Sequence, residues 1–199
     1  MSRVFSFLFF FVSLWIGLSA VFSHMVFIFD FDYPFYFIVW ISTFIFSLSV
    51  FLKPILSTRK SLRERFSKSV SWPHFVKFIN GLTWALPFTL IPFFQKDYPF
   101  LLLAGLSSGN ISTFIFLRRY SRIHSIEQII TGSVLLSSLF CILILYYGYS
   151  VDYESILFAS RLLISLSYGL GGVVGYFKEF WHIRHIYISA FSYCCYYLW

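Results

Sequence analysis

The chain has 199 residues, of which 59% are hydrophobic and only 12% are charged, and its mean hydropathy is +0.79. A soluble domain carries about 25% charged residues, so this composition excludes a water-soluble globule and is typical of a membrane protein. The net charge of +7 does not indicate nucleic-acid binding, because the basic residues lie in short runs between apolar segments, where they act as topology signals.

Six segments are long and apolar enough to cross a bilayer, which takes roughly 20 residues as a helix. In chain order they are residues 4–29, 34–52, 79–94, 99–117, 129–147 and 155–177. The third is the shortest and carries Pro87 and Pro92, which predict a kink. We therefore predict an all-α, polytopic transmembrane bundle of six spans that occupies residues 1–177.

The distribution of basic residues predicts the orientation of this bundle. Residues 57–78, between the second and third spans, form a basic loop or surface helix, and more basic residues follow the fourth and sixth spans. If these segments are cytoplasmic, 13 of the 15 Lys and Arg residues lie inside. The positive-inside rule then favours cytoplasmic N- and C-termini, with the six spans forming three outward hairpins in the cell membrane.

The tetrapeptide Asp-Tyr-Pro-Phe occurs twice, at residues 32–35 and 97–100, and the related Asp-Tyr-Glu-Ser follows at residues 152–155. Each copy falls at an outer turn and opens an even-numbered span. Asp is a good N-cap, Pro is tolerated in the first helical turn, and Tyr suits the membrane interface. We interpret the repeat as a helix start rather than as a binding site.

Two segments are expected at the cytoplasmic membrane surface. In the basic loop, five side chains are predicted to contact anionic lipid headgroups: Arg59, Lys60, Arg63, Arg65 and Lys68. Residues 178–199 form an aromatic and basic C-terminal segment. Its residues 186–199 give about 21 Å of helix, too short for roughly 30 Å of hydrocarbon, so we expect a short interfacial helix or one that inserts into a partner.

Glycines at every fourth position predict close approach of membrane helices. The fourth span carries Gly105 and Gly109, and the sixth span carries Gly171 and Gly175. We expect these two spans to pack tightly against each other. The alternative is that the glycine-rich end of the sixth span is a hinge or a cavity wall.

Polar residues within the spans give the candidate contacts for a solute. Arg161 is the one charge well inside a predicted span, where a charge costs about 2.5–3.5 kcal/mol on insertion scales. It either pairs with a carboxylate near the outer surface, such as Glu154, or contacts an anion or substrate. Asn110 serves either interhelical hydrogen bonding or a polar path between spans four and six that also includes Ser165 and Tyr168.

We expect no catalytic, cofactor or metal site. Residues 105–109 match the pattern of a hydrolase nucleophile elbow, which requires a strand–turn–helix context. Residues 108–112 resemble the opening motif of the membrane glycerol-phosphate acyltransferases, whose glycine–lysine-rich and histidine–asparagine motifs are missing from this sequence. Serine on span four and glycines on span six are similar to rhomboid proteases, but Tyr168 is the nearest polar residue to their histidine, and without a base a serine is a weak nucleophile.

Two classes of function fit this pattern. The first is a non-catalytic accessory or structural subunit of a larger membrane assembly, in contact with other membrane subunits or with copies of itself. The alternative is a small-solute transporter or channel, since six crossings with both ends inside resemble one half of a major-facilitator transporter. The scarcity of ionisable groups within the spans favours the accessory subunit, because ion-driven transporters carry acidic or histidine relays there.

Overall fold

The computed structural model describes the backbone of residues 3–57, 59–60, 63–64, 67 and 72–196, and the side chains of these residues from 6 to 178. The described chain is helical, which confirms the all-α fold. Its helices are α1 (Arg3–Ile28), α2 (Pro34–Ser57), α4 (His74–Leu90), α5 (Tyr98–Ser121), α6 (Ile126–Leu143) and α7 (Tyr153–Tyr196), with the 3-10 helix η1 (Gln95–Asp97) and the π-helix η2 (Ile144–Gly148).

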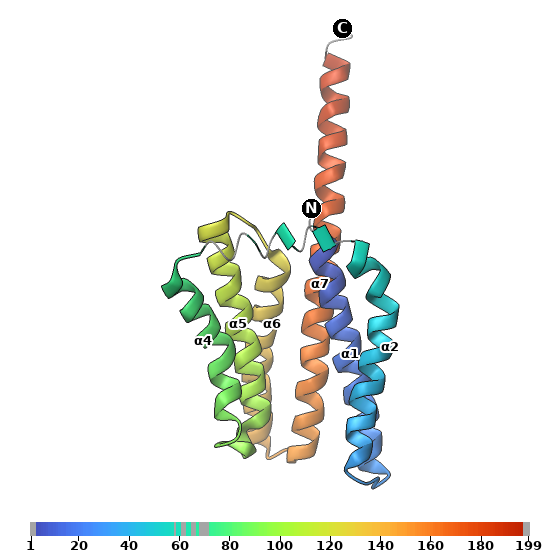
Figure 1. Ribbon diagram of the computed structural model, residues 1–199, viewed down its shortest axis with the longest axis vertical. Coiled ribbons are helices and arrows are strands. Elements are labelled where there is room, and N and C mark those ends of the chain that lie inside the picture. The colour runs from blue at the N-terminus through green and yellow to red at the C-terminus, as the bar shows by residue number, and fades with distance from the viewer. Residues whose placement is uncertain (1–2, 58, 61–62, 65–66, 68–71, 197–199) are drawn as a thin grey trace.

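The helices lie side by side in a bundle from which α7 extends at one end (Figure 1). Contacts between neighbours place them in the order α2, α1, α7, α6, α5, α4, with a smaller contact between α5 and α7. The connections after α1, α4 and α6 all lie at the end opposite to the extension of α7 (Figure 1). We refer to that end as the turn end.

Five of the described helices are long and apolar enough to cross a membrane, which indicates a membrane protein. They are Ser6–Ile28, Pro34–Ser57, Gln95–Ser121, Ile126–Gly148 and Tyr153–Lys178. The prediction of six spans differs by one helix. The difference is α4, which has only 17 residues and is therefore about 26 Å long.

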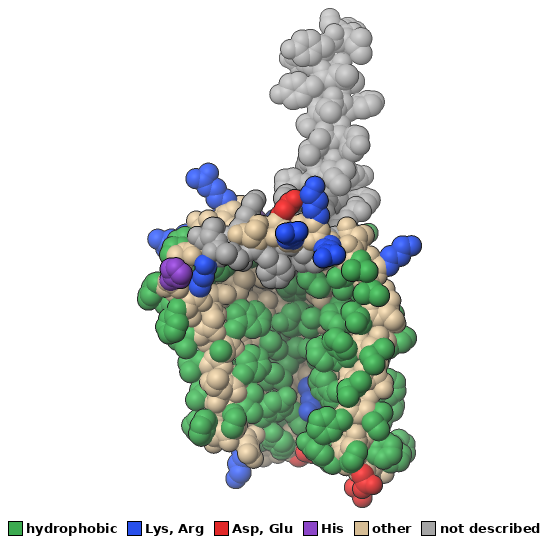
Figure 2. Space-filling view, in the orientation of Figure 1, with side chains coloured by type: hydrophobic (Ala, Val, Ile, Leu, Met, Phe, Trp, Pro, Cys, Tyr) green, Lys and Arg blue, Asp and Glu red, His purple; other side chains and the backbone are tan. Residues whose placement is uncertain are grey.

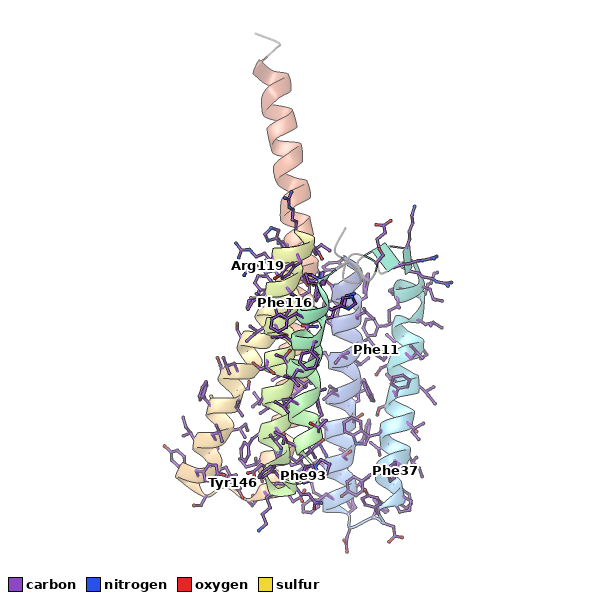
Figure 3. The ribbon with its side chains drawn as sticks, turned by 60° about the vertical axis from the view of Figure 1, so that its left-hand side comes forward. Phe11, Phe37, Phe93, Phe116, Arg119 and Tyr146 are labelled. Carbon is purple, nitrogen blue, oxygen red and sulfur yellow. The ribbon has the colours of Figure 1, made fainter. Side chains whose placement is uncertain are left out.

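The polarity of the bundle is inverted relative to that of a soluble protein. At most 1% of the surface of Ser19, Ser107 and Ser167 is exposed, whereas Phe93 is 80% exposed. Figure 2 shows an apolar belt between the two ends, with basic side chains gathered at the end from which α7 extends. Aromatic side chains occur along the whole length of the bundle, from Phe116 near the end where α7 extends to the turn end (Figure 3). This arrangement suits a lipid solvent, which covers apolar surface and leaves small polar groups to bond between helices.

The glycines of α5 lie against α4 and not against α7. A Cβ atom at Gly105 would lie 3.0 Å from the ring of Pro87, and one at Gly109 would overlap the ring of Trp84. Two hydrogen bonds join the same helices, from Trp84 Nε1 to Thr113 Oγ1 at 3.0 Å and from Ser108 Oγ to the Thr83 carbonyl at 3.0 Å. Small residues therefore do permit close approach here, but their partner is α4.

The glycines of α7 lie against α1 and α6. A Cβ atom at Gly171 would lie 2.8 Å from the backbone oxygen of Glu127 on α6, and one at Gly175 would lie 2.8 Å from Ser6 Oγ on α1. The expected tight packing of the fourth and sixth spans on each other is thus not observed. A glycine spacing identifies a face that can approach another helix closely, and it does not identify the partner.

The repeated Asp-Tyr element marks the helix starts as predicted. α2 begins at Pro34, α5 at Tyr98 and α7 at Tyr153. Asp152 accepts a hydrogen bond from the backbone N–H of Ser155 at 2.9 Å, and this bond lowers the pKa of the exposed Asp152 carboxyl below its ordinary value. The Asp97 side chain makes no such capping bond, so the predicted N-cap is formed at Asp152 and not at Asp97.

The C-terminal segment continues α7 instead of forming a helix of its own. α7 is one helix from Tyr153 to Tyr196, whereas a separate short helix was expected at 186–199. The physical reason is that residues 178–196 contain neither Gly nor Pro, so nothing in the sequence interrupts the helix. Its location at a membrane interface stays a prediction.

The basic loop is described only in part. Arg59, Lys60 and Arg63 have helical backbones and exposed side chains, as a surface helix requires. Arg65 and Lys68 lie outside the described residues. The contact of these side chains with lipid headgroups stays a prediction.

Candidate functional site

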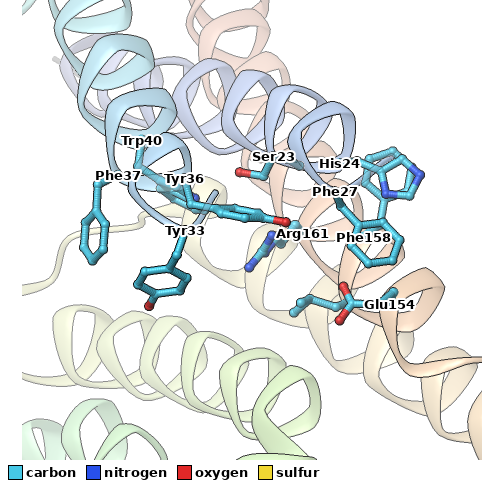
Figure 4. A pocket seen from close by; sticks show the side chains of 12 residues that line it. Ser23, His24, Phe27, Tyr33, Tyr36, Phe37, Trp40, Glu154, Phe158 and Arg161 are labelled. Atoms are coloured by element: carbon cyan, nitrogen blue, oxygen red, sulfur yellow. The ribbon is translucent and has the colours of Figure 1, made fainter. Parts of the chain in front are cut away.

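A pocket of about 540 Å³ lies near the turn end, between α1, α2 and α7 (Figure 4). Most of its wall is aromatic and aliphatic, as is usual for sites that bind small molecules. The side chains that bring polar groups to the wall include Ser23, His24, Tyr36, Trp40, Glu154 and Arg161.

The pocket has the shape of a wedge with α1 as its floor. α2 and α7 each pack against α1, but in the described part of the chain the backbones of α2 and α7 do not approach each other closely. The two walls therefore diverge, and the pocket is open along its side, where the apolar belt faces the surroundings of the protein. A ligand could enter from the membrane as well as from water.

Arg161 is the dominant electrostatic feature of the pocket. Its Cζ atom lies 5.7 Å from the centroid of the Trp40 ring, and its Nε is buried without a hydrogen-bond partner. No hydrogen bond or ion pair joins its guanidinium to another residue of the described chain. The expected pair with Glu154 is thus not formed, although both side chains line the pocket (Figure 4).

The contact with Trp40 compensates the charge of Arg161 only in part. A cation–π contact contributes about 0.5–2 kcal/mol, whereas a charge inside a span costs about 2.5–3.5 kcal/mol on insertion scales. Arg161 follows the start of α7 by eight residues, or about 12 Å, and lies within the fifth candidate span. An anion in the pocket would supply the missing compensation.

Trp40 is held in place by the seam between α1 and α2. The indole N–H of Trp15 donates to the Trp40 carbonyl at 3.3 Å, and the two indole rings meet edge to face with centroids 5.8 Å apart. One turn further along each helix, the hydroxyls of Ser19 and Thr43 are 2.6 Å apart. The aromatic platform under Arg161 is therefore positioned before any ligand arrives.

Ser23 and His24 complete the wall formed by α1. Ser23 is 1% exposed, and its Oγ has no hydrogen-bond partner, whereas helical serines such as Ser167 donate to their own backbone. The His24 ring stacks on Phe158 of α7 at 4.2 Å and fixes the distance between α1 and α7 at this level.

Of the four residues predicted to form a path between spans four and six, the structure brings together only Asn110 and Tyr168. Asn110 Nδ2 donates to the Leu106 carbonyl at 2.7 Å and to Tyr168 Oη at 3.2 Å, which joins α5 to α7 in the core. Ser165 Oγ donates to the backbone of α1 at 2.8 Å. Arg161 lies about 10 Å along the helix from Tyr168, in the wedge beside α2.

Sequence reasoning identified Arg161 and missed the rest of this pocket. Ser23, His24 and Trp40 are ordinary residues of their spans when taken singly. The signal that could have found them is their position on both sides of the turn at residues 29–33, because a hairpin brings its two arms to the same level. Beyond this pocket, no group of three His, Cys, Asp or Glu side chains in the described residues could hold a metal ion.

The fold and the pocket define the class: an all-helical protein with five helices able to cross a membrane and a charged, aromatic pocket between three of them. No known protein family, characterised protein or solved structure matches the chain. The pocket around Arg161 is the feature from which a function can be argued.

Proposed function

We propose that the chain is an integral protein of the cell membrane that crosses it six times, with both termini in the cytoplasm. α4 is the sixth crossing in this proposal. It lies along α5 (Figure 1), and Thr83 and Trp84 bond to side chains of α5 at 2.7 and 3.0 Å. The basic residues favour the end from which α7 extends as the cytoplasmic side.

Within this framework the protein acts without catalysis, by binding an organic anion in the pocket between α1, α2 and α7. The observation that supports this function is the guanidinium of Arg161, which is half-buried in the pocket wall and has no anionic partner among the described residues. Arginine presents its donors in a planar fork that matches the oxygens of phosphate and carboxylate groups. The aromatic wall suits the apolar part of the same ligand.

Thermal unfolding in a neutral detergent tests this function. Bound ligand stabilises the native state, by about 2.7 kcal/mol at 100 times Kd, so an alkyl phosphate should raise the melting temperature of the wild type. Arg161→Gln should abolish the increase, and Arg161→Lys should retain part of it. The matched control is Arg119→Gln, which removes an exposed arginine of α5 at the other end of the bundle.

The proposal fails if alkyl phosphates and fatty acids raise the melting temperature of the Arg161→Gln and wild-type proteins equally. It also fails if none of these anions stabilises the wild type. An equal loss in Arg119→Gln would mean that the response reflects net charge and not the pocket.

A role as an accessory subunit of a larger membrane assembly is the second proposal. α2 favours it, because only 11% of its most apolar window is buried within the bundle, against 39% for the spans that contain α5 and α7. A partner subunit or a second copy could cover the exposed face of α2. Purification in mild detergent distinguishes the cases: stoichiometric membrane partners support the accessory role, and a solitary monomer contradicts it.

A transport path between α5 and α7 receives no such support. The amide nitrogen of Asn110 donates to the Tyr168 hydroxyl at the contact between these helices, so this nitrogen already serves to join them. A transport role would have to use the pocket at Arg161 instead.

A further inference from the structure

Two opposite charges of the pocket share one face of α7. Glu154 lies in the first turn of α7 and Arg161 follows seven residues later, a spacing that returns to the same helix face. Seven residues correspond to about 10 Å along the axis. Side chains lean toward the N-terminus of their helix, which for α7 is the turn end, so Arg161 leans toward the level of Glu154.

Neither charge is neutralised within the described chain. The carboxylate of Glu154, like the guanidinium of Arg161, forms no hydrogen bond or ion pair with another described residue, although both line the same pocket. The pocket therefore offers a carboxylate near the turn end and a guanidinium deeper in the bundle. A complementary ligand carries a cation near the surface and an anion below it.

Zwitterionic phospholipids have their charges in this order. In a bilayer the phosphate lies next to the glycerol and the acyl chains, and the ammonium lies further out. Tyr33 and Tyr36 stand in the wall across the pocket from Glu154 (Figure 4) and offer aromatic faces, which attract ammonium groups.

The open side of the wedge gives such a lipid a route into the pocket. The backbones of α2 and α7 do not approach each other closely in the described chain, and the two helices meet through the side chains of Arg161 and Trp40. A headgroup can therefore reach Arg161 from the side while its acyl chains stay in the bilayer. A ligand dissolved in water has no need of a lateral opening, and the exposed apolar side chains at its edge, such as Phe37 with 58% exposure, suit lipid chains.

We infer that the pocket binds a zwitterionic phospholipid of the leaflet at the turn end, with its phosphate at Arg161 and its ammonium at Glu154. This inference rests on the proposed function and names the class of ligand. The inference predicts different roles for the two charged residues. Arg161 should bind the phosphate of every phospholipid, whereas Glu154 should bind only lipids with an ammonium group.

Competition between lipids tests the inference. Wild type, Glu154→Gln, Arg161→Gln and the control Arg119→Gln are reconstituted in vesicles with equal parts of phosphatidylethanolamine and phosphatidylglycerol, and the lipids retained after extraction are counted by native mass spectrometry. The wild type and Arg119→Gln should retain mainly phosphatidylethanolamine. Glu154→Gln should shift the ratio toward phosphatidylglycerol, about two- to fivefold for an exposed charge pair, and Arg161→Gln should retain little of either lipid.

The outcomes separate this inference from the function on which it rests. If Glu154→Gln keeps the wild-type ratio while Arg161→Gln loses both lipids, anion binding stands and the zwitterionic ligand is overturned. If excess glycerophosphoethanolamine, which has no acyl chains, displaces the lipid, the ligand is a soluble one and the inference is again overturned. If Arg161→Gln retains the same lipids as wild type, both proposals fail. Arg161→Lys keeps the positive charge, so lipid retained by Arg161→Lys would show that a loss in Arg161→Gln comes from the missing charge and not from misfolding.

Discussion

At the scale of single residues, the pocket is organised around a charge whose surroundings are built in advance. Arg161 rests over the face of Trp40. Trp15 donates a hydrogen bond to the Trp40 carbonyl and packs edge to face against the Trp40 ring. The platform belongs to α2, whereas the charge belongs to α7, and the backbones of these two helices do not approach each other closely in the described chain. The cation–π contact is thus a direct link across the open side of the wedge.

Replacement of Trp40 should weaken ligand binding without abolishing it. Trp40→Leu removes a contact worth about 0.5–2 kcal/mol, so the guanidinium loses its orientation, and the affinity for an alkyl phosphate should fall about 2- to 30-fold. Trp40→Phe keeps an aromatic face and should lose less. Titration of the melting temperature with ligand measures both variants, and an unchanged affinity in Trp40→Leu would show that the platform does not position Arg161.

At the scale of the helices, glycines decide which neighbours pack closely. Gly171→Ala should lower the melting temperature, because the new Cβ would meet the backbone oxygen of Glu127 at 2.8 Å as well as Thr131, and backbone cannot move aside at little cost. Gly81→Ala is the matched control, since it lies in the helix α4 with nothing within 4 Å of the new atom.

The two variants should change stability in opposite directions. Alanine is favoured over glycine within a helix by about 0.5–1 kcal/mol, so Gly81→Ala should be neutral or stabilising in thermal unfolding. If Gly171→Ala is as stable as Gly81→Ala, the contact between α6 and α7 is looser than the structure describes.

Helix positions could be predicted from the sequence to a greater extent than helix partners. Long apolar runs identified the spans, and the Asp-Tyr element located the starts of α2, α5 and α7, because both signals are local. The partners of Gly105 and Gly171 could not be predicted, since a small residue marks a face without naming the helix opposite. For the pocket, Arg161 was evident as an isolated charge, while the role of Trp40 depends on a hairpin that joins two spans.

At the scale of the whole molecule, the inverted polarity argues that all the helices of the bundle share one solvent. The surface of α4 is apolar like that of the longer helices, with Phe75 and Phe78 at 71% and 66% exposure. Its polar side chains, such as Thr83, bond to α5. A helix of this pattern lying in water would expose large aromatic groups, and this supports our proposal that α4 lies in the membrane despite its length.

Thiol labelling of intact cells tests whether α4 crosses the membrane. Single cysteines replace His74 and Lys96, which are exposed at the two ends of the segment, in a chain whose three native cysteines are changed to serine. If α4 crosses, Lys96→Cys should react with an impermeant reagent from outside, and His74→Cys should react only after permeabilisation.

A second pair of cysteines calibrates the first. Tyr149 and His124 are exposed in the connections on either side of α6, which is long and apolar enough to cross a membrane, so Tyr149→Cys should label from outside and His124→Cys from inside. Labelling of His74→Cys and Lys96→Cys from the same side, with the second pair on opposite sides, would mean five crossings. The termini would then lie on opposite sides of the membrane, because an odd number of crossings separates them.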